Sequence, residues 1–252
     1  MHRFFVERPI DGVGEAVPLP REESEHAARV LRLRAGEAVR LLDGAGLYDA
    51  ELREVNDRAT TAVVTAVCPS PEPCAQAVLW QGLPKADKLE LIAQKATELG
   101  AWELWPVEMR HCVAKADKTG RADQKRERLA RIALEAAKQS GRAHVPQIAP
   151  VRSFEEVLAA LAQAPGFDLV LVAWEEERAL PMSEAVRAYT AEHGVPTRVL
   201  IVIGPEGGIS VEEHQLLREA GAVSVTLGKR ILRTETAGLC ALSVLWTVLG
   251  EM

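Results

Sequence analysis

Apolar residues in the second part of the chain form short β-branched runs that alternate with amphipathic stretches. Five runs have the length and composition of buried strands, at 78–82, 102–107, 169–174, 199–203 and 223–227. Five stretches have helical spacing, at 89–99, 123–139, 154–162, 182–192 and 234–249. Strands that alternate with helices predict an α/β domain in which a parallel sheet is covered on both faces.

The first part of the chain has a different pattern, in which short strand signals surround a single helical stretch. The strand signals lie at 4–6, 38–42, 48–55 and 60–67, and the helical stretch lies at 22–32. Several short strands with one helix predict a small β-barrel. Prolines alternate at 69, 71 and 73, where they favour extended backbone and disfavour both helix and sheet pairing. We therefore expect two domains, at 1–70 and 75–252.

Two glycine-containing loops follow strands near the end of the chain. The first reads GlyProGluGlyGly at 204–208, and the second reads LeuGlyLysArgIleLeuArgThrGluThrAla at 227–237. Ligands of α/β sheets bind at the carboxyl ends of strands, and glycine lets a ligand approach the backbone closely. The first loop alone equally fits a tight turn in which Ser210 caps a helix and Glu213 completes a capping box. The polar residues gathered in the second loop favour a shared pocket.

Several common kinds of site are missing from the sequence. The chain has no GxxxxGK[ST] motif, no GxGxxG after its first strand, no HExxH and no CxxC, so neither a common nucleotide site nor a metal site is expected. It has no apolar run of about 18 residues and no signal-peptide pattern at its start. Its four cysteines are scattered. We expect a cytoplasmic protein with reduced thiols and no membrane partner.

The net charge of −6 argues against a general nucleic-acid binder, because such proteins are usually basic. The charge is unevenly distributed, however. Residues 110–142 contain ten lysines and arginines against four aspartates and glutamates. A basic patch on an acidic protein can hold phosphates with a limited footprint. A solvated helix face would have the same composition.

The two loops together resemble the SPOUT RNA methyltransferases, and within them the RsmE type, which methylates N3 of a uridine in 16S ribosomal RNA. Matching stretches also lie at 26–32, 85–100 and 135–142, so the resemblance covers nearly the whole chain. It implies a PUA-like RNA-binding barrel at 1–70 and a SPOUT methyltransferase domain at 75–252 with a C-terminal trefoil knot. It also implies a homodimer, S-adenosylmethionine as cofactor, and 16S rRNA or the assembled small ribosomal subunit as partner.

The resemblance implies that the strand ends and the two loops hold the cofactor. The expected cofactor-binding residues are Leu171, Val172, Ala173, Ile203, Gly204, Gly208, Leu227, Gly228, Ile231 and Leu232. Core packing would explain the apolar members of this set equally well.

Arg233 is the leading candidate for a catalytic residue. N3 of uridine is nucleophilic as an anion, and a guanidinium stabilises such an anion with paired donors. Glu206 and Glu235 are the candidate proton acceptors. Alternatively, Arg233 pairs with one of these glutamates and only orders the loop. Thr236 is expected to cap the last helix.

Basic residues scattered along the chain are candidates for contacts with RNA phosphates. They are Arg3, Arg29, Arg32, Lys85, Lys88, Arg110 and Arg142. Exposure to solvent alone is an alternative explanation for each. Two other functions also stay open: methylation of another rRNA base or of a ribose 2′-oxygen, and ribosome assembly without chemistry.

Overall fold

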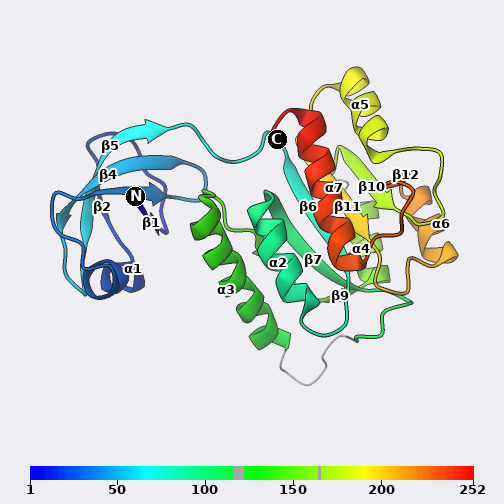
Figure 1. Ribbon diagram of the computed structural model, residues 1–252, viewed down its shortest axis with the longest axis horizontal. Helices are drawn as coiled ribbons and strands as arrows, with labels where there is room; N and C mark the ends of the chain where they lie inside the picture. Colours follow the sequence, from blue (N-terminus) through cyan, green and yellow to red (C-terminus); the bar gives the residue numbers. More distant parts are fainter. Residues whose placement is uncertain (116–121, 164–165) are drawn as a thin grey trace. The chain divides into compact units, whose positions relative to one another are not determined.

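The computed structural model describes residues 1–115, 122–163 and 166–252 (Figure 1). The chain divides into two compact units. The N-terminal unit comprises Met1–Glu72 and Ala137–Val145, and the C-terminal unit comprises Pro73–Ala136 and Pro146–Met252. The division after Glu72 falls within the proline-rich stretch. That Ala137–Val145 belongs to the N-terminal unit is a finding of the structure, because nothing in the local sequence pattern indicates it.

A parallel sheet forms the centre of the C-terminal unit. Its strands are β6 (Gln76–Gly82), β7 (Ala101–Glu108), β8 (Gln147–Ile148), β9 (Arg152–Ser153), β10 (Leu169–Ala173), β11 (Arg198–Ile203) and β12 (Val223–Val225). They lie in the order β12-β10-β11-β6-β7-β8, β9 also pairs with β7, and each of these pairings is parallel. Successive residues of β6 and β11 are almost all buried, so the sheet is covered on both faces, as the sequence predicts.

Helices complete the C-terminal unit. They are α2 (Lys88–Glu98), α3 (Ala122–Ser140, whose last turn belongs to the N-terminal unit), α4 (Phe154–Gln163), α5 (Met182–His193), α6 (Val211–Glu219) and α7 (Thr234–Leu249). Helices α2 and α7 pack side by side, and α7 also contacts β6 and β11 (Figure 1). The indole N–H of Trp246 on α7 donates a hydrogen bond to the carbonyl of Leu99 at the end of α2. This packing places the start of α7 beside the carboxyl ends of the central strands.

The sequence predicts one helix start correctly and another wrongly. At α6, the hydroxyl of Ser210 accepts a hydrogen bond from the backbone of Glu213, whose carboxylate accepts one from the backbone of Ser210, so the capping box is confirmed. At α7, the N-cap residue is Arg233, with no side-chain cap hydrogen bond. Thr236 therefore does not cap α7, because the helix begins two residues before it.

The N-terminal unit contains a five-stranded sheet. Its strands are β1 (His2–Phe5), β2 (Ala16–Pro18), β3 (Ala38–Leu42), β4 (Leu47–Glu54) and β5 (Thr61–Cys68), in the order β1-β3-β4-β5-β2. Only the β1–β3 pairing is parallel. Alternating residues such as Phe4, Leu41 and Leu52 form its core. Strand β2 escapes sequence prediction because it has only three residues, one of them a proline.

The single helix expected at 22–32 is interrupted. Helix α1 (Arg21–Glu25) continues as a π-helical turn, η1 (His26–Val30), and Arg32 has a positive φ of 53°. Non-glycine residues rarely adopt this left-handed conformation. Arg32 is therefore held in a strained backbone conformation, and its side chain is exposed.

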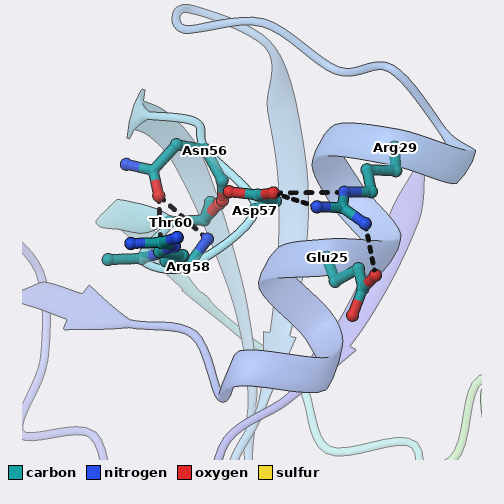
Figure 2. A network of polar contacts seen from close by, with 7 residues as sticks. Glu25, Arg29, Asn56, Asp57, Arg58 and Thr60 are labelled. Carbon is teal, nitrogen blue, oxygen red and sulfur yellow. Dashed lines mark hydrogen bonds and ion pairs between the residues drawn. The ribbon is translucent and has the colours of Figure 1, made fainter.

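An ion-pair network joins η1 to the turn between β4 and β5 (Figure 2). The guanidinium of Arg29 donates hydrogen bonds to Asp57, with 3.1 Å between Nε and Oδ2, and to Glu25 at 3.0 Å. The Asn56 side-chain oxygen accepts hydrogen bonds from the backbone N–H groups two and three residues further on, and so shapes the turn that contains Asp57. Arg29 is thus exposed but already paired with two carboxylates.

A buried ion pair fastens the segment 137–145 within the N-terminal unit. Arg142 Nε donates to Glu72 Oε2 at 3.0 Å, and the backbone N–H groups of Ala143 and His144 donate to Glu72 Oε1. The side chains of Arg142 and Glu72 are only 5% and 9% exposed. Arg142 is therefore part of the interior, and we remove it from the candidates for RNA contact.

Candidate active site

A cavity of about 370 Å³ lies at the carboxyl ends of β10, β11 and β12. Eight of the ten residues expected to bind the cofactor line it: Ala173, Ile203, Gly204, Gly208, Leu227, Gly228, Ile231 and Leu232. Leu171 and Val172 are instead fully buried within β10. The two glycine-containing loops therefore form one pocket, with the residues just after β10 as a further wall.

The first loop packs closely against the end of β6. A Cβ atom added to Gly82 would lie 2.5 Å from the backbone nitrogen of Pro205, and one added to Gly204 would lie 2.7 Å from the Ile209 side chain. Gly208 has a φ of 75°, which favours glycine. Glycine is needed at 82 and 204 because a side chain would collide with neighbouring protein atoms, and it is favoured at 208 by the backbone conformation.

A buried hydrogen-bond chain connects β6, α7 and the first loop. The amide of Gln81 donates to the hydroxyl of Thr234 at 2.7 Å, and that hydroxyl donates to the carbonyl of Gly204 at 2.6 Å. Gln81 is fully buried and Thr234 nearly so. These two hydrogen bonds fix the first loop relative to the start of α7, and both Gly204 and Thr234 line the cavity.

The second loop lines the cavity and contains backbone groups that are not paired among the described residues. Gly228 has a φ of 115° and its N–H donates to the Thr226 hydroxyl. Within the described ranges, the backbone N–H groups of Leu227, Ile231 and Leu232 have no hydrogen-bond partner. Ile231 is 79% exposed although it is apolar. Unpaired amides beside exposed apolar side chains suit a flat heterocyclic ligand.

Several residues that line the cavity were missed in the sequence, and Trp174 is the clearest. Its ring stacks on His214 of α6, with 3.6 Å between ring centroids and 14° between planes. His214 also contacts the Ser224 hydroxyl. Burial, and then the nearby Arg218 charge, lower the pKa of His214. Trp174 directly follows β10, so its place at a strand end was a signal that could have revealed it.

Other charged side chains also line the cavity. Glu175 and Arg178 are not expected from the sequence, whereas Arg230 is one of the polar residues of the second loop. The cavity is thus bordered by cations and carboxylates from several elements. Such a mixed border suits a ligand that carries both charge signs.

Lys88, at the start of α2, connects the two candidate proton acceptors. Its Nζ lies 3.0 Å from Glu206 Oε1 and 3.2 Å from Glu235 Oε2. The Glu206 carboxylate also accepts a hydrogen bond from the backbone N–H of Lys85. A hydrogen bond to Glu206, and then the ion pair with Glu235, raise the pKa of Lys88. Lys88 therefore stays charged and forms an ion pair with each of the two carboxylates.

The same contacts lower the pKa values of the two glutamates. Burial by itself would raise the pKa of Glu206, but the Lys85 N–H and the Lys88 ammonium outweigh it. Burial likewise opposes the shift at Glu235, where its own backbone N–H and Lys88 prevail. Both glutamates are therefore ionised near neutral pH and weakly basic.

Arg233 lines the same cavity and is exposed. In the part of the chain that the structure describes, its guanidinium forms no hydrogen bond or ion pair. The alternative in which Arg233 pairs with Glu206 or Glu235 is not what the structure contains, because Lys88 pairs with both. A guanidinium free of carboxylates is available for an anionic group.

The candidates for RNA contact lie in different settings. Arg3 donates hydrogen bonds to the carbonyls of Lys138 and Gln139. Arg110 pairs with Glu212 at 2.9 Å, with both side chains exposed. Lys85 and Arg32 are exposed. Part of the basic segment, 116–121, lies outside the described residues.

Among the residues described, no three histidines, cysteines, aspartates or glutamates are grouped so that they could hold a metal ion. No helix in the described ranges is long and apolar enough to cross a membrane.

Comparisons with known proteins cover nearly the whole chain. Residues 70–246 match the model of an RNA methyltransferase domain, and residues 19–65 match that of an RNA methyltransferase PUA domain. The chain is 37% identical to ribosomal RNA small subunit methyltransferase E of Bacillus subtilis, over 97% of this chain and 96% of the relative. It is 31% identical to the protein of that name from Mycobacterium bovis, over 95% of this chain and 88% of the relative.

Solved structures agree with this assignment. The ribosomal RNA small subunit methyltransferase E of Neisseria gonorrhoeae, bound to S-adenosylmethionine, has a TM-score of 0.80 and 31% identity, with 98% of this chain and 97% of that chain covered. A Legionella pneumophila methyltransferase in complex with the same cofactor has a TM-score of 0.71 and 27% identity, with 97% and 96% covered. The chain therefore belongs to the RNA methyltransferase family that includes ribosomal RNA small subunit methyltransferase E.

Proposed function

We propose that this protein transfers a methyl group from S-adenosylmethionine to N3 of a uridine in 16S ribosomal RNA. The observation that carries the proposal is the cavity at the ends of β10, β11 and β12, which combines unpaired backbone amides with the free guanidinium of Arg233. Relatives with this fold are named for the small-subunit RNA, and two of the solved neighbours hold S-adenosylmethionine.

The cavity fits this cofactor in size and chemistry. A volume of about 370 Å³ is in the range of small-molecule sites. We propose that the amides of Leu227, Ile231 and Leu232 read the adenine edge, and that the first loop, through Gly204 and Gly208, lies against the rest of the cofactor. When bound, S-adenosylmethionine would supply the methyl group of its sulfonium, and the neutral thioether S-adenosylhomocysteine would leave without help from a metal.

The residues of the chain have to deal with the proton and charge of the uridine. N3 must lose its proton, and the resulting anion spreads its charge onto the two flanking carbonyl oxygens. We propose that Arg233 stabilises this anion with its planar donors. Of the two candidate proton acceptors, Glu206 lines the cavity and Glu235 does not, and their lowered pKa values make both weak bases.

We further propose that exposed basic residues hold the RNA phosphates. Arg32, Lys85 and Arg110 are exposed, whereas Arg3 and Arg29 would have to give up or share existing hydrogen bonds. Lys88 would have to leave two carboxylates. These contacts would supply affinity and position the subunit, whereas Arg233 acts on the base.

The family resemblance adds finer proposals about architecture and assembly. We propose that the sheet of the N-terminal unit is a PUA-like RNA-binding barrel and that α7 closes a trefoil knot. We propose a homodimer that acts in the cytoplasm on 16S rRNA or on the assembled small subunit. Domains at 1–70 and 75–252 would then divide recognition from chemistry, with Ala137–Val145 joining the recognition unit.

Methyl transfer to purified small subunits tests the proposed function. Subunits from a bacterial strain that lacks its own enzyme are incubated with the protein and S-adenosylmethionine labelled in the methyl group. We expect label in the RNA, and calorimetric heat when the cofactor alone is titrated into the protein. Heat without label would contradict the proposed RNA substrate. The absence of both heat and label would favour an assembly factor that does no chemistry.

Gly204→Val is expected to weaken cofactor binding by about tenfold or more, because a side chain there forces the first loop, which lines the cavity, to shift, and a loss of about 1.4 kcal/mol is enough for that factor. The first atom added would already lie 2.7 Å from the Ile209 side chain. Calorimetry with S-adenosylmethionine measures the loss. Ala191→Val adds the same kind of side chain at an exposed position of α5 and is the control. Unchanged affinity in a folded Gly204→Val protein would contradict the pocket assignment.

Arg32→Gly is expected to weaken binding to small subunits and to lower the slope of log affinity against log salt by about one, as for loss of one phosphate contact. The free energy of unfolding should change by less than about 1 kcal/mol, because relief at the φ of 53° opposes the flexibility of glycine in the unfolded chain. Arg32→Lys keeps the charge and should bind like wild type. An unchanged salt slope in Arg32→Gly would remove this residue from the RNA surface.

A further inference from the structure

We propose that Lys88 is a positioning residue that keeps Arg233 free by holding both neighbouring carboxylates, Glu206 and Glu235. The inference rests on the proposed function, because it assigns Arg233 to the substrate. It gives Lys88 a role other than contact with RNA, and it gives Glu235 a role other than accepting the proton.

The geometry brings three separate elements to one ammonium group. Lys88 is the first residue of α2, Glu206 lies in the loop after β11, and Glu235 lies in the first turn of α7. The Nζ of Lys88 lies within 3.2 Å of a carboxylate oxygen from each glutamate. Its side chain is only 29% exposed, so this position is held by the surrounding structure.

The electrostatic consequence concerns Arg233, which lies two residues before Glu235. The charge of Arg233 already acts on Glu235, although no contact joins them. Without Lys88, the ionised carboxylates of Glu206 and Glu235 would have no cation between them. An arginine forms paired hydrogen bonds with a carboxylate readily, and Arg233 would then turn toward Glu235 and away from the substrate.

Other cations on the cavity do not replace Lys88 in this role. Arg178 and Arg230 line the cavity, but neither is joined to Glu206 or Glu235 by an ion pair among the described residues. Lys88 contacts both carboxylates at once. Lys88 and Arg233 are the cations whose charges act on Glu235. Removal of the Lys88 ammonium therefore leaves Arg233 to interact with this carboxylate.

The test compares variants of the full chain in single-turnover methylation of small subunits, with subunits and S-adenosylmethionine both saturating. Lys88→Met removes the ammonium, and Lys88→Arg keeps a cation in its place. Lys88→Met/Glu235→Gln also removes the carboxylate that would capture Arg233. Lys95→Met is the matched control, because Lys95 is on the same helix and pairs with Glu98 away from the cavity. Lys88→Gln, which keeps a donor for one carboxylate, replaces Lys88→Met if that variant does not fold.

We expect Lys88→Met to lower the single-turnover rate by about tenfold, while its affinities for the cofactor and the subunit change by about twofold or less. Lys88→Arg and Lys95→Met should stay near the wild-type rate. The double variant should be faster than Lys88→Met, because no ionised Glu235 remains to pair with Arg233. Recovery of rate on removal of a second group is a result that a merely structural role for Lys88 would not give.

Three results would overturn the inference. One is a Lys88→Met rate equal to that of Lys95→Met. Another is a double variant slower than Lys88→Met, which would make Glu235 the proton acceptor. The third is a loss confined to subunit affinity, which would make Lys88 a phosphate contact. A wild-type protein that transfers no methyl group would instead overturn the proposed function, so the two failures are distinguishable.

Discussion

Arg233→Ala is expected to lower the rate of methyl transfer by about a hundredfold to a thousandfold, with little change in cofactor affinity. A charge-assisted contact made in the transition state contributes about 2.7–4 kcal/mol. The guanidinium is exposed on the cavity and unpaired within the described residues, so its loss should not disturb the fold. Single-turnover rates, with calorimetry on the same protein, measure the two quantities separately.

The pH dependence of Arg233→Ala identifies what the guanidinium does. Raising the pH should partly restore the rate of the variant, because more of the uridine is then already ionised at N3. Arg233→Lys should restore the rate only in part, because an ammonium lacks the planar pair of donors. Arg187→Ala, at an exposed position on α5, is the control and should keep the wild-type rate. Loss of cofactor binding together with activity would indicate that Arg233 only orders the loop.

Glu72→Gln is expected to destabilise the N-terminal unit by about 3–5 kcal/mol, because it removes the charge of one member of a buried ion pair. The side chains of both residues are less than 10% exposed, and the carboxylate also holds two backbone N–H groups. Chemical denaturation followed by far-ultraviolet circular dichroism measures the effect. It should shift the midpoint of the transition that reports the N-terminal unit.

The distribution of tryptophan separates the two units in this experiment. All five tryptophans lie in the C-terminal unit, so their fluorescence reports that unit alone. In Glu72→Gln, the circular dichroism signal should begin to change at lower denaturant than the fluorescence. Glu51→Gln breaks an exposed pair with Arg53 and should cost less than about 1 kcal/mol. An equally small effect of Glu72→Gln would show that the buried pair does not hold the unit together.

The alternation of apolar residues predicts the parallel sheet and its helices because the periods of strands and helices are local properties of the sequence. It also predicts that two loops meet at one edge, since parallel strands end on the same side. It misses the transfer of Ala137–Val145 to the N-terminal unit, because that depends on the ion pair between Glu72 and Arg142, 70 residues apart. It misses the interruption of α1 for the same reason, since tertiary contacts override helix propensity.

At the candidate site, the glycines and Arg233 are visible in the sequence, because their residue types and their place after strands suggest a use. The hydrogen bonds from Gln81 to Thr234 and from Thr234 to Gly204 are not, because β6 and α7 meet only in the folded chain. The contacts of Lys88 are hidden similarly, since its partners lie 118 residues away or more. Sequence reasoning treats Lys88 as free for RNA, whereas folding supplies its carboxylates.

The identity of the methylated nucleoside tests the central claim most directly. Small subunits from a strain without the enzyme are methylated by the purified protein, and their RNA is digested to nucleosides for mass spectrometry. The account predicts one new product, 3-methyluridine, which maps to a single site in 16S rRNA and which Arg233→Ala forms about a hundredfold to a thousandfold more slowly. A methyl group on a ribose 2′-oxygen or on another base would contradict it, because neither requires a guanidinium beside an ionised uridine N3.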